Sequence, residues 1–162
     1  MSKSIVIDAT RNCDTRAEGF DPDSLTSAIV KSDTQKHITA VQMCGDFICE
    51  KIQEQFALHD NTKLGDNLEA FTDALRSGFA DNDFKANKWW KTHLKERHHL
   101  NDKCPEDVNL VDVLELICDC VSAGLARTGT VYDISLPIDI LEMAFHNTVR
   151  LMIDNIEVKE DM

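Results

Sequence analysis

Apolar residues recur with a helical period along most of this chain. The strongest pattern lies between Leu110 and Leu125, where apolar side chains return every three or four residues and define the stripe of an amphipathic helix. Proline and glycine are scarce, at three and six residues, so long helices are permitted almost everywhere. The predicted helices run from about Asp33 to Ala57, from Leu68 to Phe79, from Trp89 to about Leu100, from Leu110 to Leu125 and from Ile138 to about Asn155. The pattern predicts an all-α fold, a single-domain bundle of five or six helices.

The two ends of the chain differ from the helical region. Residues 1–23 are polar except for a candidate short strand at Ser4–Ile7, and we interpret them as an N-terminal arm. The helical domain is predicted to occupy residues 24–157, followed by a short tail at 158–162. At 162 residues the chain is long enough to bury one hydrophobic core.

The charge and the cysteines limit what the protein binds and where it acts. The formal net charge is −12 at pH 7, which argues against binding of a nucleic-acid duplex because phosphate contacts need a clustered basic surface. No stretch approaches the roughly 18 apolar residues of a membrane span, and the apolar run near the N-terminus is too short for a secretion signal. The six cysteines include no CxxC pair, so we expect free thiols rather than a cysteine zinc site. These features predict a cytoplasmic protein, in the host cytoplasm if the chain is phage-encoded.

Candidate chemistry begins in "LHDNTKL", where His59 and Asp60 are adjacent and Lys63 follows three residues later. Such a pair suits a metal, because imidazole nitrogen binds transition metals and a carboxylate can bridge two cations. Lys63 would place an ammonium near the metals for a substrate phosphate. An HD dipeptide alone also fits a helix cap or an ordinary surface turn, so further ligands must come from elsewhere in the chain.

An acidic stripe follows the strongest predicted helix. "NLVDVLELICDC" sets Asp112, Glu115 and Asp119 at i, i+3 and i+7, which is one face of a helix. The ordinary explanation is a solvated face. Because apolar residues lie between these positions, the carboxylates are also expected to border the core, where each needs a cation or a hydrogen-bond donor.

A third cluster lies in "WWKTHLKERHH", which holds His93, His98 and His99. On a regular helix His93 and His98 would be about 140° apart and His98 and His99 about 100° apart, so they could not all face one metal. We expect the helix to end near Arg97–His99, or two metals to be bound. A solvated basic helix end explains the same residues without a metal.

The position of His37 is harder to reconcile with such a site. It precedes His59 by 22 residues, and an unbroken helix would separate the two by about 33 Å. His37 can be a ligand only if the helix breaks, with Gly45 as the weak point.

The tryptophan pair Trp89–Trp90 begins the third cluster. Packing of one of these side chains and partial exposure of the other is favoured over stacking on a nucleobase.

The ordered set resembles the HD superfamily of metal-dependent phosphohydrolases, whose pattern runs H … HD … D. "HDNTK" also resembles the HDxGK of its branch that cleaves cyclic dinucleotides, with Thr62 in place of glycine. More closely, the chain is similar to a family of uncharacterised phage and bacterial proteins that combines "HI..V", "HD.SKL", "H....RHH", "NL.D..EM..DW" and a late "NT". The matching segments are "HITAV" (37–41), "HDNTKL" (59–64), "HLKERHH" (93–99), "NLVDVLELICDC" (109–120) and "HNT" (146–148). The resemblance covers about residues 35–150 and implies an HD-domain-like fold, with Thr62 for serine, Leu116 for methionine and Cys120 for tryptophan as departures.

The resemblance implies a metal-dependent phosphohydrolase that acts on a small phosphorylated substrate, a nucleotide or another phosphate ester. Its cofactor would be two divalent transition-metal ions, Mn, Fe, Co or Zn, since histidine and carboxylate ligands suit these better than Mg. The predicted metal ligands are His59, Asp60 as a bridge, His93, His98, His99 and Asp119, with His37 as an additional ligand. Lys63 and Arg97 would neutralise the substrate phosphate, and Glu115 would accept a proton or orient a ligand.

Other functions remain open from the sequence. A di-iron site in an HD-type fold can oxidise a substrate instead of hydrolysing it. A phage-type protein could bind and inhibit a host factor with a structural or degenerate metal site. A chain with no metal, with surface histidines and a solvated acidic stripe, is a third interpretation. The sequence also leaves a homodimer open.

Overall fold

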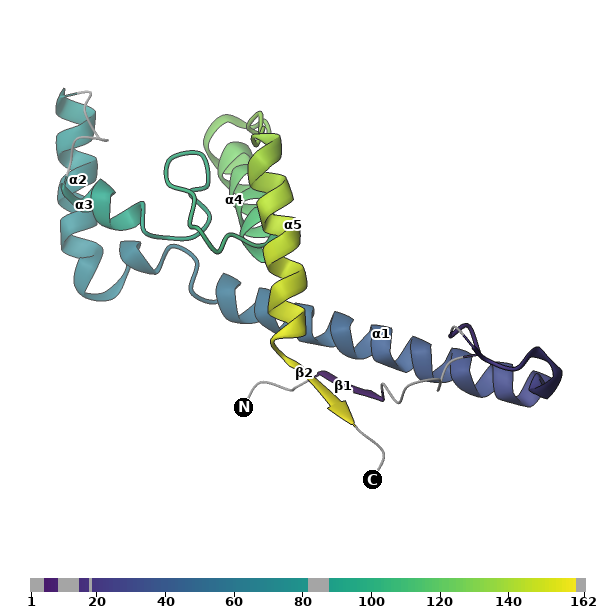
Figure 1. Cartoon of the computed structure of the whole chain (residues 1–162). Helices are drawn as coiled ribbons and strands as arrows, with labels where there is room; N and C mark the ends of the chain where they lie inside the picture. The colour runs from purple at the N-terminus through teal and green to yellow at the C-terminus, as the bar shows by residue number, and fades with distance from the viewer. Residues whose placement is uncertain (1–4, 9–14, 18, 82–87, 160–162) are drawn as a thin grey trace. The chain divides into compact units, whose positions relative to one another are not determined.

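A computed structural model describes residues 5–8, 15–17, 19–81 and 88–159 of the chain (Figure 1). The main elements are β1 (Ile5–Asp8), α1 (Ser27–Phe56), α2 (Leu68–Asp81), α3 (Lys88–His93), α4 (Leu110–Thr128), α5 (Ile138–Ile153) and β2 (Ile156–Lys159). Four of these helices are long and α3 has a single turn and a half, so the predicted all-α fold is confirmed. None of the helices in these described ranges is long and apolar enough to cross a membrane.

The chain divides into two compact units, each with its own contacts. The first comprises residues 1–51 and 149–162. Within it, β1 and β2 pair in parallel, from Ile5 opposite Ile156 to Asp8 opposite Lys159. The Ile5 amide also donates to the Asn155 carbonyl at 2.8 Å, and the Ile5 side chain is buried. The predicted strand near the N-terminus is therefore present, paired with a strand that the periodicity did not indicate. The predicted domain boundaries at residues 23 and 157 stay a prediction, and the second of them falls inside β2.

The second unit comprises residues 52–148. Its core joins the loop after α3 to α4 and α5, with Leu100, Val108, Val113, Leu116 and Ala144 at the centre. Helix α4 begins at a capping box, in which the Asn109 side chain accepts from the Val111 amide and the Asp112 side chain accepts from the Asn109 amide. It ends at Gly129, whose φ of 76° is the left-handed conformation that glycine adopts without strain. These two caps fix both ends of the helix that carries the acidic stripe.

Two helices differ from their predicted bounds in ways that matter for the site. The helix expected from Trp89 to about Leu100 ends at His93. Turns follow it up to residues 97–99, which we call the RHH segment. After His93 the amide hydrogen bonds change to an i−3 pattern, with Glu96 bonded to the His93 carbonyl at 2.9 Å. In contrast, α1 continues through Gly45 without a break.

Candidate metal centre

The HD pair lies in the tight turn that follows α1 in the second unit. Asp60 has a φ of 58°, a positive value that glycine usually adopts. Among the described non-glycine residues, Asp60 alone has a positive φ. A short 3-10 turn follows from Asn61 to Lys63. A left-handed aspartate costs free energy and persists only where its surroundings hold it. A partner from outside the turn stabilises this conformation.

That partner is Glu96, in the loop after α3. Its carboxylate accepts hydrogen bonds from the Asp60 amide at 2.8 Å, from the Thr62 amide at 2.9 Å and from the Thr62 hydroxyl. Burial raises the pKa of Glu96, but the bonds from Thr62 and Asp60 and the nearby His93 outweigh it and lower the pKa. Glu96 is thus an ionised clasp that fixes the backbone of the HD turn.

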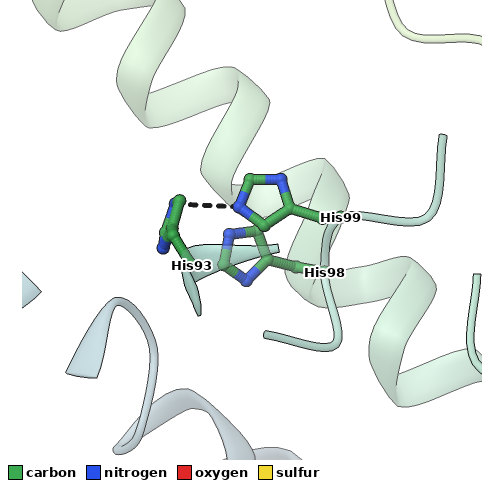
Figure 2. Close-up of side chains that lie close together, drawn as sticks. All are labelled: His93, His98 and His99. Carbon is green, nitrogen blue, oxygen red and sulfur yellow. Dashed lines mark hydrogen bonds between the residues drawn. The ribbon is translucent and has the colours of Figure 1, made fainter. Parts of the chain in front are cut away.

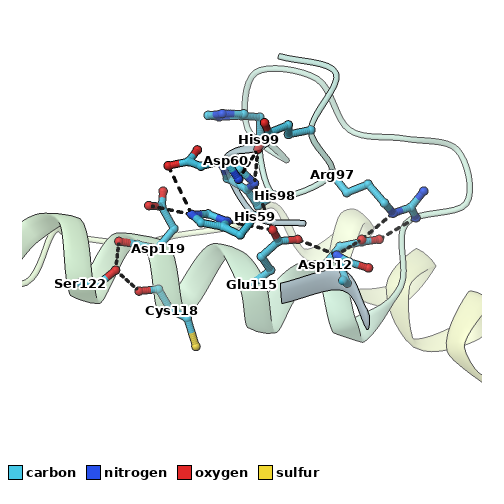
Figure 3. A network of polar contacts seen from close by, with 12 residues as sticks. His59, Asp60, Arg97, His98, His99, Asp112, Glu115, Cys118, Asp119 and Ser122 are labelled. Atoms are coloured by element: carbon cyan, nitrogen blue, oxygen red, sulfur yellow. Dashed lines mark hydrogen bonds and ion pairs between the residues drawn. The ribbon is translucent and has the colours of Figure 1, made fainter. Parts of the chain in front are cut away.

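A second carboxylate fixes the ring of His59. Glu115 lies 2.9 Å from His59 Nδ1 and also accepts from Gln55 Nε2 at 2.6 Å (Figure 3). Burial raises the pKa of Glu115, but His98, Gln55 and His59 around it lower the pKa to about 2. An ionised carboxylate can only accept, so Nδ1 of His59 carries a proton, and in the neutral imidazole this leaves the lone pair on Nε2. This is the usual outer partner of a metal-binding histidine.

The free Nε2 of His59 faces two carboxylates. It lies 3.6 Å from Asp60 Oδ2 and 3.7 Å from Asp119 Oδ1. Metal–ligand bonds of about 2.0–2.2 Å place neighbouring donor atoms about 2.8–3.1 Å apart in octahedral geometry and about 3.3–3.6 Å apart in tetrahedral geometry. Each of the two carboxylate oxygens therefore lies close to the distance at which it and His59 Nε2 could bind the same cation.

The RHH segment brings its histidines together beside the same aspartate. His93 and His98 are buried, and His93 Nε2 lies 2.8 Å from His99 Nε2 (Figure 2). The Thr62 hydroxyl donates to Glu96 and so accepts from His93 Nδ1 at 2.8 Å, which leaves the lone pair of a neutral His93 on Nε2. That atom lies 3.7 Å from Asp60 Oδ1.

The protonation of these imidazoles follows from their burial and their neighbours. Burial and the nearby Lys63 lower the pKa of His93, although Glu96 and Asp60 oppose this, and burial together with the other two histidines lowers the pKa of His99 to about 4. Burial lowers the pKa of His98 too, but Glu115 and other carboxylates outweigh it and raise the pKa. His93 and His99 are consequently neutral near pH 7, the form that binds metals.

Asp60 stands between the two sets of histidines. Its Oδ2 accepts from Lys63 Nζ, and burial is outweighed by Lys63, His59 and His93, so the pKa of Asp60 is lowered. Its Oδ1 is buried and makes no hydrogen bond. In the part of the chain that the structure describes, the other buried side-chain polar atom without a hydrogen bond is His98 Nδ1. An ionised oxygen without a donor is costly to bury. Both unsatisfied atoms belong to predicted metal ligands, and a cation beside Asp60 Oδ1 would satisfy that oxygen.

Three groups of donors within the described residues are close enough for one ion each. They are His93 with His98 and His99, His59 with His98 and Glu115, and Asp60 with His93 and Glu96. The nitrogen and oxygen donors fit a divalent transition metal. Asp119 adds a further oxygen beside His59. The structure thus brings together eight residues that the sequence analysis named for the site: His59, Asp60, Lys63, His93, His98, His99, Glu115 and Asp119.

Two predicted residues lie outside these groups. Arg97 holds the buried Asp112 with Nε and Nη2 at 2.6 and 2.8 Å, and its Nη1 contacts Asp107 (Figure 3). These bonds raise the pKa of Arg97 and explain its position without a substrate. His37 lies on α1 in the first unit, along a pocket that Val6 and Ile7 of β1 also line. None of the three donor groups found in the described ranges includes His37.

Three residues that position the site were not predicted from the sequence. Gln55 donates to both Asp112 and Glu115, at 2.7 and 2.6 Å, and so separates the two buried carboxylates. Thr62 was noted only as a departure from a family motif, and Glu96 was given no role. Their role depends on partners 31–60 residues away, which no local spacing indicates.

A pocket of about 610 Å³ opens beside the histidines in the second unit. Its lining combines polar and apolar side chains: Lys63, His93, His99, Asp119 and Arg127 are polar, and Phe71, Leu75, Trp89 and Trp90 are apolar, and Gly78 is also part of the lining. This volume is in the range of small-molecule sites. Predicted ligands therefore face a space that can admit a substrate.

The fold and site define an all-α protein with a histidine- and carboxylate-rich candidate metal centre. A model of a family of unknown function, DUF5662, matches residues 26–157, and the chain belongs to this family. The matched segment includes every residue of the candidate centre. No curated protein and no solved structure matches the chain.

Proposed function

We propose that the protein is a metal-dependent phosphohydrolase, a divergent relative of the HD superfamily, that cleaves a phosphate ester. The observation that carries the proposal is the Asp60 carboxylate, which has His59 Nε2 near one oxygen and His93 Nε2 near the other. Its buried Oδ1 has no hydrogen-bond donor. This is the arrangement expected of a carboxylate that bridges two cations.

The residues divide between two cation positions that share Asp60. His59 with Asp119 would hold one ion, and His93 with His98 and His99 would hold the other. Bound divalent ions would lower the pKa of a water and stabilise negative charge on the phosphate oxygens. Glu96 fixes the backbone of Asp60 and so holds the Asp60 carboxylate in place for both ions.

The remaining side chains orient ligands and balance charge. Glu115 holds the tautomer of His59, and with a pKa of about 2 it is a weak base at neutral pH. We therefore assign it an orienting role rather than proton transfer. Lys63 borders the pocket and is bonded to Asp60, so its charge offsets the carboxylates where a phosphate would approach.

The proposed location is the cytoplasm, where the described cysteines, which are free, would stay reduced. A small phosphorylated substrate is the proposed ligand, and no second chain is needed for the donor set. The oxygenase and host-factor interpretations gain no specific contact from the structure.

Elemental analysis with a matched pair of variants tests the proposal. Asp60→Asn keeps the size of the side chain and removes its charge, and Asp46→Asn makes the same change at an exposed position of α1. We expect the parent and Asp46→Asn to retain up to about two equivalents of Mn, Fe, Co or Zn after loading and desalting. Asp60→Asn should lose most of the metal while its helical circular dichroism is unchanged.

The same samples are then assayed for hydrolysis of p-nitrophenyl phosphate and bis-p-nitrophenyl phosphate. Turnover by the parent that chelation abolishes and metal restores would support the proposal. A parent that binds no metal would refute it. Metal binding without turnover of any phosphate ester would reduce the site to a structural one and favour a binding protein.

A further inference from the structure

One face of α4 carries an exposed apolar stripe, which we call the outward stripe. Five large apolar side chains form it, and each keeps 36–52% of its surface exposed. They recur at intervals of three or four residues: Leu110, Leu114, Ile117, Val121 and Leu125. On a regular helix these positions share an arc of about 80°, which lies about 150° from the arc of the three carboxylates of α4. Figure 3 shows Cys118, which borders the outward stripe, pointing away from the histidines.

The outward stripe has no charged neighbour along α4. From Leu110 to Ala126 the charged residues are Asp112, Glu115 and Asp119. Each of these carboxylates lies beside a basic side chain of the second unit, Arg97 or His59. A contiguous exposed patch without charge is unusual on a chain with a net charge of −12 and is typical of a contact surface.

The order of the side chains makes the outward stripe complementary to itself. Consider a second copy of α4 that lies antiparallel, with a two-fold axis between positions 117 and 118. Leu110 of one copy then lies opposite Leu125 of the other, and Leu114 lies opposite Val121. Apolar side chains at intervals of three and four residues interlock in helix pairs, and a two-fold axis brings the same patch of both chains together. Two acidic chains repel each other least where both are uncharged.

The exposed area is sufficient for such a pair. Cys118, Ser122 and Ala126 border the outward stripe and are exposed as well. Together with the five large side chains they offer on the order of 500 Å² in each copy, or about 1,000 Å² in the pair. This area is at the lower limit of specific interfaces, so the expected complex is a reversible dimer with a dissociation constant in the micromolar range.

We infer that the protein forms a symmetric homodimer in which the outward stripes of two α4 helices pack antiparallel. The candidate metal centre lies on the other side of α4, so the dimer does not cover it. The inference is therefore independent of the proposed function.

Sedimentation equilibrium of the full chain in a reducing buffer tests the dimer over a wide range of protein concentration. We expect the mass to rise from that of one chain to that of two. Ile117→Glu places a carboxylate of each copy beside the two-fold axis and should weaken the dimer at least about 100-fold, with the helical circular dichroism and the metal content of the parent. Val41→Glu makes a similar change at an exposed position of α1 and should associate as the parent does.

Cross-linking with a short bismaleimide tests the position of the two-fold axis, because Cys118 and Cys49 are both free and exposed. The parent and Cys49→Ser should give cross-linked dimer, and Cys118→Ser should give far less. A parent that keeps the mass of one chain at every concentration would overturn the inference. A dimer that Ile117→Glu leaves intact would overturn it too, and so would cross-linking that does not depend on Cys118.

Discussion

Replacement of Glu96 by glutamine tests whether the HD turn is held from outside its own sequence. Glu96 Oε2 accepts from the Asp60 amide, and Oε1 accepts from the Thr62 amide and hydroxyl. Glutamine keeps one acceptor oxygen, so its NH₂ group must face one of these donors. The variant loses at least one hydrogen bond to a charged group, about 1.5–3 kcal/mol, and leaves a donor facing a donor. We expect the free energy of unfolding to fall by about 2–4 kcal/mol.

Urea unfolding in the presence of a chelator measures this change apart from metal binding. For a urea slope near 2 kcal/mol/M, the midpoint should fall by about 1–2 M. Glu142→Gln, at an exposed position of α5, is the matched control and should stay within about 0.5 kcal/mol of the parent. Glu96→Gln should also bind metal about 10–100-fold more weakly, because Asp60 is no longer oriented. A midpoint equal to that of the control would refute the clasp.

Three further predictions concern the neighbours of this turn. Gln55→Glu replaces a donor between Asp112 and Glu115 by a third carboxylate and should lower the free energy of unfolding by at least about 2 kcal/mol at pH 7. Urea unfolding should show a smaller loss at pH 4, and an equal loss at both pH values would contradict the charge argument. Arg97→Lys removes the fork on buried Asp112 and should cost about 2–4 kcal/mol, whereas a raised KM with unchanged stability would restore its predicted phosphate role. The folded pKa of His99 is about 4 against an ordinary 6.5, so the unfolded chain takes up this proton first as the pH falls. The free energy of unfolding of the metal-free protein should therefore fall by roughly 3 kcal/mol between pH 6.5 and pH 4. His99→Asn should show less of this loss in unfolding measurements across that range.

The helices could be predicted because their signal is local. A 3.6-residue period of apolar side chains located α1, α2, α4 and α5, and the chemistry of histidine and carboxylate selected the HD turn and the RHH segment. The prediction was too long at α3, which ends at His93 where a helix to about Leu100 was expected. It also gave no sign of β2, since four residues paired with a strand near the opposite terminus carry no period of their own.

The acidic stripe shows what sequence could not decide. Asp112 and Glu115 are one helical turn apart in the same apolar setting, and nothing in their spacing separates their roles. The fold places Arg97 and the start of α4 around Asp112, which makes it a cap and an ion-pair partner. It places His59 and His98 beside Glu115, which makes it part of the candidate centre. The sequence by itself determined which groups could bind a metal, because that depends on side-chain chemistry. It did not determine their hydrogen-bond partners, because these lie 15–60 positions away in the chain and only tertiary packing brings them within hydrogen-bond distance.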